Sequence, residues 1–186
     1  IPHAMERILP SGTMQLLVNL EADELRWWSD GDVCHLPGSA VAGAFARPFA
    51  IETAHQRVVT GVLFAPGGAA GFLPGSMRAF ANTHVAFSDL PAAYGSIREQ
   101  LLEAHTQSAC AVIRTWEQIL RGGWRARAVD RSPIQAARRG LEAGRSVQDV
   151  ADRLAISARK LRQDFVAAVG LSPKSYARVF LSLIPI

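Results

Sequence analysis

The side chains best able to bind a metal in this sequence are histidines, four of which lie well inside the chain at His35, His55, His84 and His105. Imidazole sites for metals need clustered ligands, such as a His-x-His pair with a nearby glutamate. No two of these histidines lie within helical or strand spacing of each other. We therefore expect no metal site, and each histidine is expected to be hydrogen-bonded in the fold or exposed.

Residues 66–71 are rich in glycine, as phosphate-binding loops are. A P-loop ends in Gly-Lys-Ser/Thr, which is not found here, so a turn from a strand into a short helix is expected instead. The serines and the two cysteines, Cys34 and Cys110, lie in no recognisable nucleophile motif. We expect no catalytic residue, no cofactor and no enzymatic activity.

Arginine and glutamine side chains share one face of a helix predicted over residues 158–169. Positions i, i+3, i+4 and i+7 of this helix, from Arg159 to Val166, point away from its apolar side. Arg and Gln form paired hydrogen bonds with guanine and adenine edges in the major groove, and flanking Lys and Ser side chains suit phosphates. A helical hairpin with a solvated basic surface is the alternative. The candidate DNA-binding residues are Ser157, Arg159, Lys160, Arg162 and Gln163.

Charge is distributed unevenly along the 186 residues. Residues 1–121 carry 8 Arg, no Lys and 11 acidic residues, a net charge of −3, whereas residues 122–186 carry 12 basic and 5 acidic residues, a net charge of +7. Such asymmetry favours a nucleic-acid partner for the second part.

No run of 18 apolar residues and no secretory signal is found, and two cysteines make no disulfide framework. We expect a cytoplasmic protein with no membrane partner.

The first part of the sequence is expected to fold as strands followed by two helices. Short segments rich in β-forming residues predict an antiparallel sandwich or barrel; they are residues 13–20, 25–28, 49–53 and 58–64. Asp89 is expected to cap a helix with Pro91 in its first turn. The apolar sides of the two helices are formed by Ile97, Leu101 and Leu102, and by Ala109, Val112, Ile113, Trp116 and Leu120. Trp27 and Trp28 alternate across a strand, so one can line a ligand cavity, but packing in the core is expected for both.

The second part is predicted to be helical. Residues 122–131 have paired glycines and no clear period, which indicates a linker between a domain at 1–121 and a domain at 132–186. Four helices follow, and each begins at a serine that can cap it. Gly144 fits the left-handed position after the first of them. The caps are Ser132, Ser146, Ser157 and Ser172, and the central buried residues are Ile134, Ala137, Leu141, Val150, Ala151, Leu161 and Phe165.

Residues 146–165 and 169–176 resemble the first helix-turn-helix of AraC/XylS-type transcription regulators. The pattern S-x-R-x-L-x-x-x-F of that family is found at residues 157–165, and it leads into G-L-S-P-K-x-Y, as in the family. The resemblance implies a bacterial regulator that binds double-stranded DNA in a sequence-specific manner, with residues 158–169 in the major groove.

The N-terminal part is similar to the β-rich domain found in one branch of the same family, a domain that resembles a cupin barrel. The similar segments are residues 6–12, 47–49 and 61–70. The resemblance implies an α+β fold, with a cupin-like sensing or dimerisation domain that binds a small-molecule effector and is followed by an all-helical DNA-binding domain.

The family carries a long helix and a second helix-turn-helix after the first one, whereas this sequence ends soon after Phe180. A truncated product or a fragment is therefore expected, with weak and strongly salt-dependent DNA binding. The apolar stripe of Tyr176, Val179, Phe180 and Leu183 is then expected to seek cover, either on the N-terminal domain or in a homodimer. The alternative function is a ligand- or protein-binding module without sequence-specific DNA binding.

Overall fold

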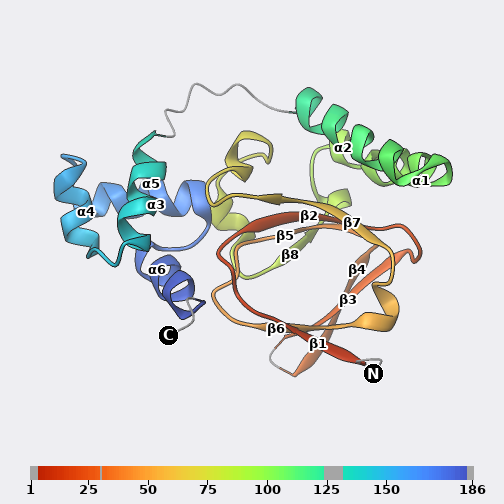
Figure 1. Cartoon of the computed structure of the whole chain (residues 1–186), viewed down its shortest axis with the longest axis horizontal. Helices are drawn as coiled ribbons and strands as arrows, with labels where there is room; N and C mark the ends of the chain where they lie inside the picture. Colours follow the sequence, from red (N-terminus) through yellow and green to blue (C-terminus); the bar gives the residue numbers. More distant parts are fainter. Residues whose placement is uncertain (1–3, 30, 124–131, 184–186) are drawn as a thin grey trace.

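The fold consists of a β-rich region followed by helices (Figure 1). The computed structural model describes residues 4–29, 31–123 and 132–183. Within these ranges, eight strands form two antiparallel four-stranded sheets that face each other as in a sandwich. The predicted α+β fold class is confirmed.

Most of the strands pair with strands distant in the sequence, whereas the third strand pairs with the next one, the fourth. The first sheet has the order β1-β6-β3-β4, formed by β1 (Met5–Ile8), β6 (Phe49–Glu52), β3 (Glu24–Ser29) and β4 (Asp32–Pro37). The second has the order β7-β2-β5-β8, formed by β7 (Val59–Phe64), β2 (Met14–Asn19), β5 (Ser39–Ala42) and β8 (His84–Ala86). The four predicted strands correspond to β2, β3, β6 and β7, whereas β1, β4, β5 and β8 are not predicted from the sequence.

The second sheet separates the hydrophobic core from a partly open cavity. In β2, Met14, Leu16 and Val18 are at most 4% exposed and belong to the core. Successive residues of a strand point to opposite faces, so Gln15 and Leu17 face the other way and line a cavity between the two sheets. The core therefore lies between this sheet and the helices that cover it (Figure 1).

Helix α1 (Ile97–Gln107) begins later than the sequence predicts. The expected cap at Asp89 and helix start at Pro91 are wrong, because 3₁₀ turns occupy this stretch. The buried Tyr94 side chain explains the difference. Its hydroxyl donates a hydrogen bond to the carbonyl oxygen of Phe72 (2.6 Å), and this tertiary contact fixes a turn where the local pattern predicts a helix.

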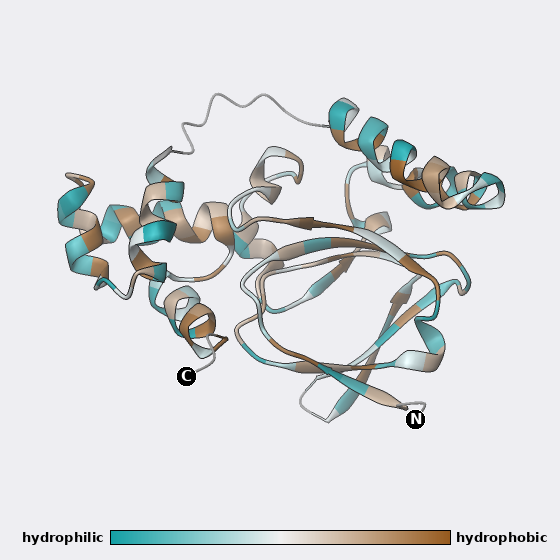
Figure 2. Ribbon diagram, in the orientation of Figure 1, coloured by the Kyte–Doolittle hydropathy of each residue, from teal (hydrophilic) through white to brown (hydrophobic). Residues whose placement is uncertain are grey.

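Helix α2 (Ala109–Gly123) packs on the outer face of β7. Its buried residues are Val112 and Trp116, and the indole Nε1 of Trp116 donates to Thr60 Oγ1 (3.0 Å). Ala109 and Ile113, predicted to face inward, are exposed, because this hydrogen bond and the burial of Trp116 set the rotation of the helix. Figure 2 shows hydrophobic and hydrophilic residues alternating along α2, as in an amphipathic helix.

Four helices form the C-terminal region: α3 (Ser132–Glu142), α4 (Val147–Arg153), α5 (Ala158–Val169) and α6 (Pro173–Ser182). The caps at Ser146, Ser157 and Ser172 are confirmed, since each side chain accepts a hydrogen bond from the amide three residues ahead. Gly144 has the expected positive φ of 75°. The predicted linker begins within α2, which continues through Gly123, and its remaining residues 124–131 lie outside the described ranges.

None of the helices described has a stretch long and apolar enough to span a bilayer.

The helical region packs directly on the β-rich region through the C-terminal half of α5. This half contacts the 3₁₀ turns η2 (Ala69–Gly71) and η3 (Met77–Phe80). Gly170 follows α5 with a φ of 92°, and a Cβ at this position would lie 3.0 Å from the carbonyl oxygen of Met77. Glycine therefore permits both the helix end and the close approach. Val169 and Met77 belong to one continuous core, so the two regions are buried against each other.

A buried amide joins three segments of the β-rich region. Asn19 is fully buried, and its Nδ2 donates to the carbonyl oxygens of Glu24 (3.1 Å) and His55 (2.7 Å). Its Oδ1 accepts from the backbone amides of Glu21 (3.0 Å) and Ala22 (2.9 Å). All four hydrogen bonds are made to backbone groups, so the side chain fixes the β2–β3 turn against the segment that follows β6.

We predict that Asn19→Ala lowers the free energy of unfolding by about 2–4 kcal/mol, because it leaves buried backbone groups unpaired. Gln107→Ala, an exposed change at the end of α1, serves as the control and is expected to be nearly neutral. Urea denaturation followed by circular dichroism measures both. Equal stability of the two variants would contradict the role assigned to Asn19.

Candidate nucleic-acid interface and internal cavity

Helices α4 and α5 form a helix-turn-helix arrangement with a tight turn. Leu161 and Phe165 on the inner side of α5 are at most 1% exposed and share a core with Val150 and Ala151 of α4. Ala155 in the turn has a φ of 53°, in the left-handed region that disfavours residues with a Cβ. The packing of the two helices therefore holds Ala155 in a backbone conformation that alanine disfavours.

The predicted DNA-binding residues lie where the helical period places them. Arg159, Lys160, Arg162 and Gln163 are exposed on α5, and together we call them the α5 basic face. Ser157 precedes them and caps the helix by accepting a hydrogen bond from the Lys160 amide (3.1 Å). The N-terminal turns of α5 are therefore both capped and exposed to solvent.

One charge of the α5 basic face is partly engaged. Lys160 Nζ forms an ion pair with Asp164 Oδ1 (2.7 Å), one turn further along α5. Both side chains are well exposed, and such pairs contribute at most about 1 kcal/mol, so a phosphate can replace the carboxylate.

An arginine of the β-rich region extends this basic surface. A shallow groove between η3 and α5 is lined by Ser76 and Arg78 on one side and by Arg162, Gln163 and Val166 on the other. Arg78 lies 84 positions before Arg162 in the chain, so no sequence pattern could have associated the two.

The helix that follows α5 is fixed to α3 by a buried hydroxyl. Tyr176 is 1% exposed, and its hydroxyl donates to Glu142 Oε1 (2.5 Å), which also accepts from Arg138 (2.8 Å). Burial and the neighbouring carboxylate raise the pKa of Tyr176 above its ordinary value, so it stays protonated as a donor. The ring of Phe165 contacts Tyr176 edge to face at 5.4 Å. These contacts hold α3, α5 and α6 as one unit; Leu183, just after α6, remains 41% exposed.

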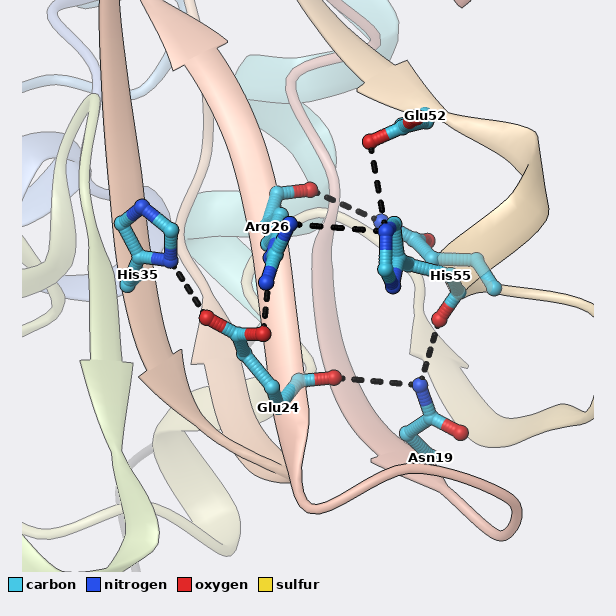
Figure 3. Close-up of polar contacts among 7 residues, drawn as sticks. Asn19, Glu24, Arg26, His35, Glu52 and His55 are labelled. Carbon is cyan, nitrogen blue, oxygen red and sulfur yellow. Dashed lines mark hydrogen bonds and ion pairs between the residues drawn. The ribbon is translucent and has the colours of Figure 1, made fainter. Parts of the chain in front are cut away.

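A network of titratable side chains occupies the outer face of the first sheet (Figure 3). The Glu24 carboxylate accepts hydrogen bonds from His35 and from Arg26 Nε (2.7 Å), and these donors hold its pKa below the ordinary value. His55 Nε2 lies 3.4 Å from Arg26 Nη1 and 3.5 Å from Glu52 Oε2. No group of three or more possible metal ligands occurs among the residues described, this network included. It forms a partly exposed ion-pair network across β3, β4, β6 and η1 (Thr53–His55).

His84 departs from the expectation for a lone histidine. Its Nδ1 is buried and has no hydrogen-bond partner, although the ring as a whole is only partly buried. Desolvation lowers its pKa to about 4, so the ring is neutral at pH 7. It faces the internal cavity of about 160 Å³ together with Trp27, which the sequence assigned to the core. Trp28 lies on the opposite face of β3.

The fold defines a protein with a β-rich N-terminal region and a helical C-terminal region. A domain family described only as a domain of unknown function, DUF6597, matches residues 2–86, which contain all eight of the described strands. No curated protein and no solved structure matches the chain.

We predict that Ala155→Gly stabilises the protein by roughly 0.5–1 kcal/mol, because glycine adopts the left-handed conformation of the turn without a Cβ clash. Ala167→Gly, at an exposed helical position of α5, is the matched control and should destabilise by about 1 kcal/mol. Thermal unfolding of both variants tests the opposite signs. A loss of stability in both would show that the turn is not strained.

We predict that acid destabilises the protein in part through His84. The pKa of His84 is lower in the folded chain than its ordinary value of 6.5, so the unfolded chain binds more protons between pH 6.5 and about 4. The free energy of unfolding is then greatest above pH 6.5 and falls by as much as about 3 kcal/mol as the pH drops to 4. His84→Phe should lose this part of the pH dependence in urea titrations at pH 7.5, 5.5 and 4.5. Parallel pH profiles for the two proteins would contradict it.

Proposed function

We propose that the chain is a sequence-specific DNA-binding transcription regulator of the AraC/XylS type. The observation that carries the proposal is the α5 basic face, which stays exposed on a capped helix whose other side is buried against α4. Arg159, Arg162 and Gln163 share one side of this helix, and such side chains form paired hydrogen bonds with guanine and adenine.

The docking of α5 on the β-rich region is compatible with this role. In helix-turn-helix proteins, residues in the N-terminal part of the second helix contact the base edges. In α5, the N-terminal half carries Arg159 and Arg162; the groove beside η3 begins at Arg162 and Gln163, and the close contact with the β-rich region lies further along, towards Gly170. Arg78 beside this half supplies a further cation for the phosphate backbone.

We predict that Arg159→Ala and Arg162→Ala each weaken binding to a preferred duplex by about 1–3 kcal/mol and relax its sequence preference. Lys160→Ala should instead weaken binding to all duplexes about equally, because its ammonium group suits a phosphate. Arg114→Ala, an exposed arginine on α2, is the control for lost charge alone. A duplex selected from a random pool is titrated with each variant by fluorescence anisotropy at several salt concentrations.

The affinity should fall steeply with salt, since phosphate contacts release counterions. Undetectable binding at low salt would contradict the proposal. Equal losses on selected and random duplexes for all three α5 variants would show that this surface is merely basic.

The second candidate function is a ligand- or protein-binding module without sequence-specific DNA binding. The contact of α5 with η3 favours it, because η3 lies beside Arg162 and Gln163 and limits the access of a DNA duplex to that side of the α5 basic face. Selection from the random pool separates the two candidates, since the module would enrich no common sequence.

A further inference from the structure

The groove between η3 and α5, which we call the η3–α5 groove, brings together hydrogen-bond donors from both regions of the chain. Its volume of about 480 Å³ lies within the range of roughly 300–1,000 Å³ that is common for ligand-binding clefts. Each of its four polar side chains can donate a hydrogen bond, and none of them is acidic. The lining consists of Ser76, Arg78, Arg162, Gln163, Val166 and Ala167.

The two arginines of this groove have no counter-charge. Arg78 and Arg162 are exposed, and neither forms an ion pair with any residue that the structure describes. Asp164, the one acidic residue of α5, pairs with Lys160 instead. On the side of η3, the sequence has no acidic residue at positions 53–88. Two cations that share a groove repel each other, and an anion between them removes this repulsion.

The backbone under both arginines is fixed before any ligand binds. Met77 precedes Arg78, and Phe165 lies one turn after Arg162. Both of these apolar side chains are fully buried and belong to the core that joins the two regions. An anion therefore has to order only the arginine side chains, which keeps the entropic cost of binding small.

The charge of the groove sets the chemistry of its occupant. Two guanidinium groups match an anion with two negative charges. A phosphate monoester carries about −1.5 to −2 at pH 7, whereas each phosphodiester of a DNA backbone carries a single charge. The groove therefore suits a monoester better than a diester.

The remaining lining suits the rest of such a compound. Guanidinium groups pair with phosphate oxygens through two parallel hydrogen bonds. Ser76 accepts a hydrogen bond from the Arg78 amide (3.3 Å) and keeps its own hydroxyl proton to donate to a third oxygen. Val166 and Ala167 offer carbon contacts to the group that the phosphate esterifies.

We propose that the η3–α5 groove binds the phosphate monoester group of a small phosphorylated compound, held by Arg78 from the β-rich region and by Arg162 from the helical region. This binding does not require the chain to bind DNA. The compound and a DNA duplex would compete for Arg162, and that consequence alone rests on the proposed function.

Phenyl phosphate and methyl phenyl phosphate are the probes, because they differ by one methyl group and one charge. In isothermal titration calorimetry at low salt, phenyl phosphate should bind saturably. The methyl ester should bind at least about fivefold more weakly, since it has lost a charge between two arginines. Phenyl phosphate should also raise the melting temperature, because the groove exists only in the folded chain.

Substitutions on each side of the groove test its two halves. Arg78→Ala and Arg162→Ala should each weaken phenyl phosphate binding about five- to fiftyfold. Arg78→Lys keeps the charge but loses the paired hydrogen bonds, so its affinity should fall in between. Arg145→Ala, which removes an exposed arginine between α3 and α4, is the control for lost charge and should change the affinity less than about twofold. Circular dichroism without ligand verifies that each variant is folded.

Three results would overturn the proposal. The first is no saturable binding of phenyl phosphate up to about 10 mM. The second is equal affinity for the methyl ester, which would assign the groove to the backbone phosphates of DNA. The third is a loss of affinity in Arg145→Ala as large as that in Arg78→Ala, which would show a general effect of charge.

Competition with DNA is measured separately, by fluorescence anisotropy of the selected duplex at constant ionic strength. Phenyl phosphate at about ten times its dissociation constant should weaken duplex binding roughly fivefold or more, and the methyl ester at the same concentration should do so less. Unchanged duplex affinity would overturn the shared use of Arg162. Binding of phenyl phosphate by a chain that binds no duplex would refute the proposed function alone, whereas duplex binding by a chain that binds no phenyl phosphate would refute this inference alone.

Discussion

The architecture depends on the second sheet, whose central strands β2 and β5 are covered on both faces. All four residues of β5 are buried, and in β2 alternate residues point into the helix-covered core or towards the cavity. A sheet in this position has little freedom of register, because a slip of one residue would exchange apolar side chains such as Leu16 with the cavity-facing Gln15. The helices α1 and α2, the second layer and the cavity all follow from this one arrangement.

Helix α5 is similarly constrained, because its twelve residues contact three different surroundings. Leu161 and Phe165 pack against α4, the end at Val169 packs against the β-rich region, and Arg159 and Arg162 remain in solvent. A period of 3.6 residues allows this division, since a helix presents separate stripes along its length. The proposed interface with DNA is therefore built on a helix whose orientation is set from both sides.

Polar interactions contribute very unequally to this fold. The network around Glu24 is partly exposed, so solvent screens its ion pairs and they add little to stability. Asn19 and Tyr176 are buried; Asn19 pairs backbone groups that would otherwise be left without partners, and Tyr176 pairs its own buried hydroxyl with Glu142. His84 is the opposite case, because its Nδ1 is buried with no partner.

The sequence by itself determined the elements whose signals are local. The caps at Ser146, Ser157 and Ser172, the left-handed Gly144 and the apolar stripe of α5 follow from contacts within a few residues, so the helices after residue 131 are predicted almost as observed. Asp149, which completes the capping box with Ser146, also lies at a spacing of three residues that the sequence alone shows. Strands β2, β3, β6 and β7 carry enough β-forming residues to be predicted as well.

Only the tertiary structure decided the rest. Strand β5 is short and made of small residues, and β4 is largely exposed and ends in proline, so each is a strand because of the partner it pairs with. The start of α1 depends on a hydrogen bond from Tyr94 to Phe72, and Arg78 joins the basic surface only through docking. His84 gains its aromatic neighbours and loses its hydrogen-bond partner only when two sheets close around it. Such features arise from groups far apart in the chain, and a pattern within a short window of sequence carries no information about which of them meet.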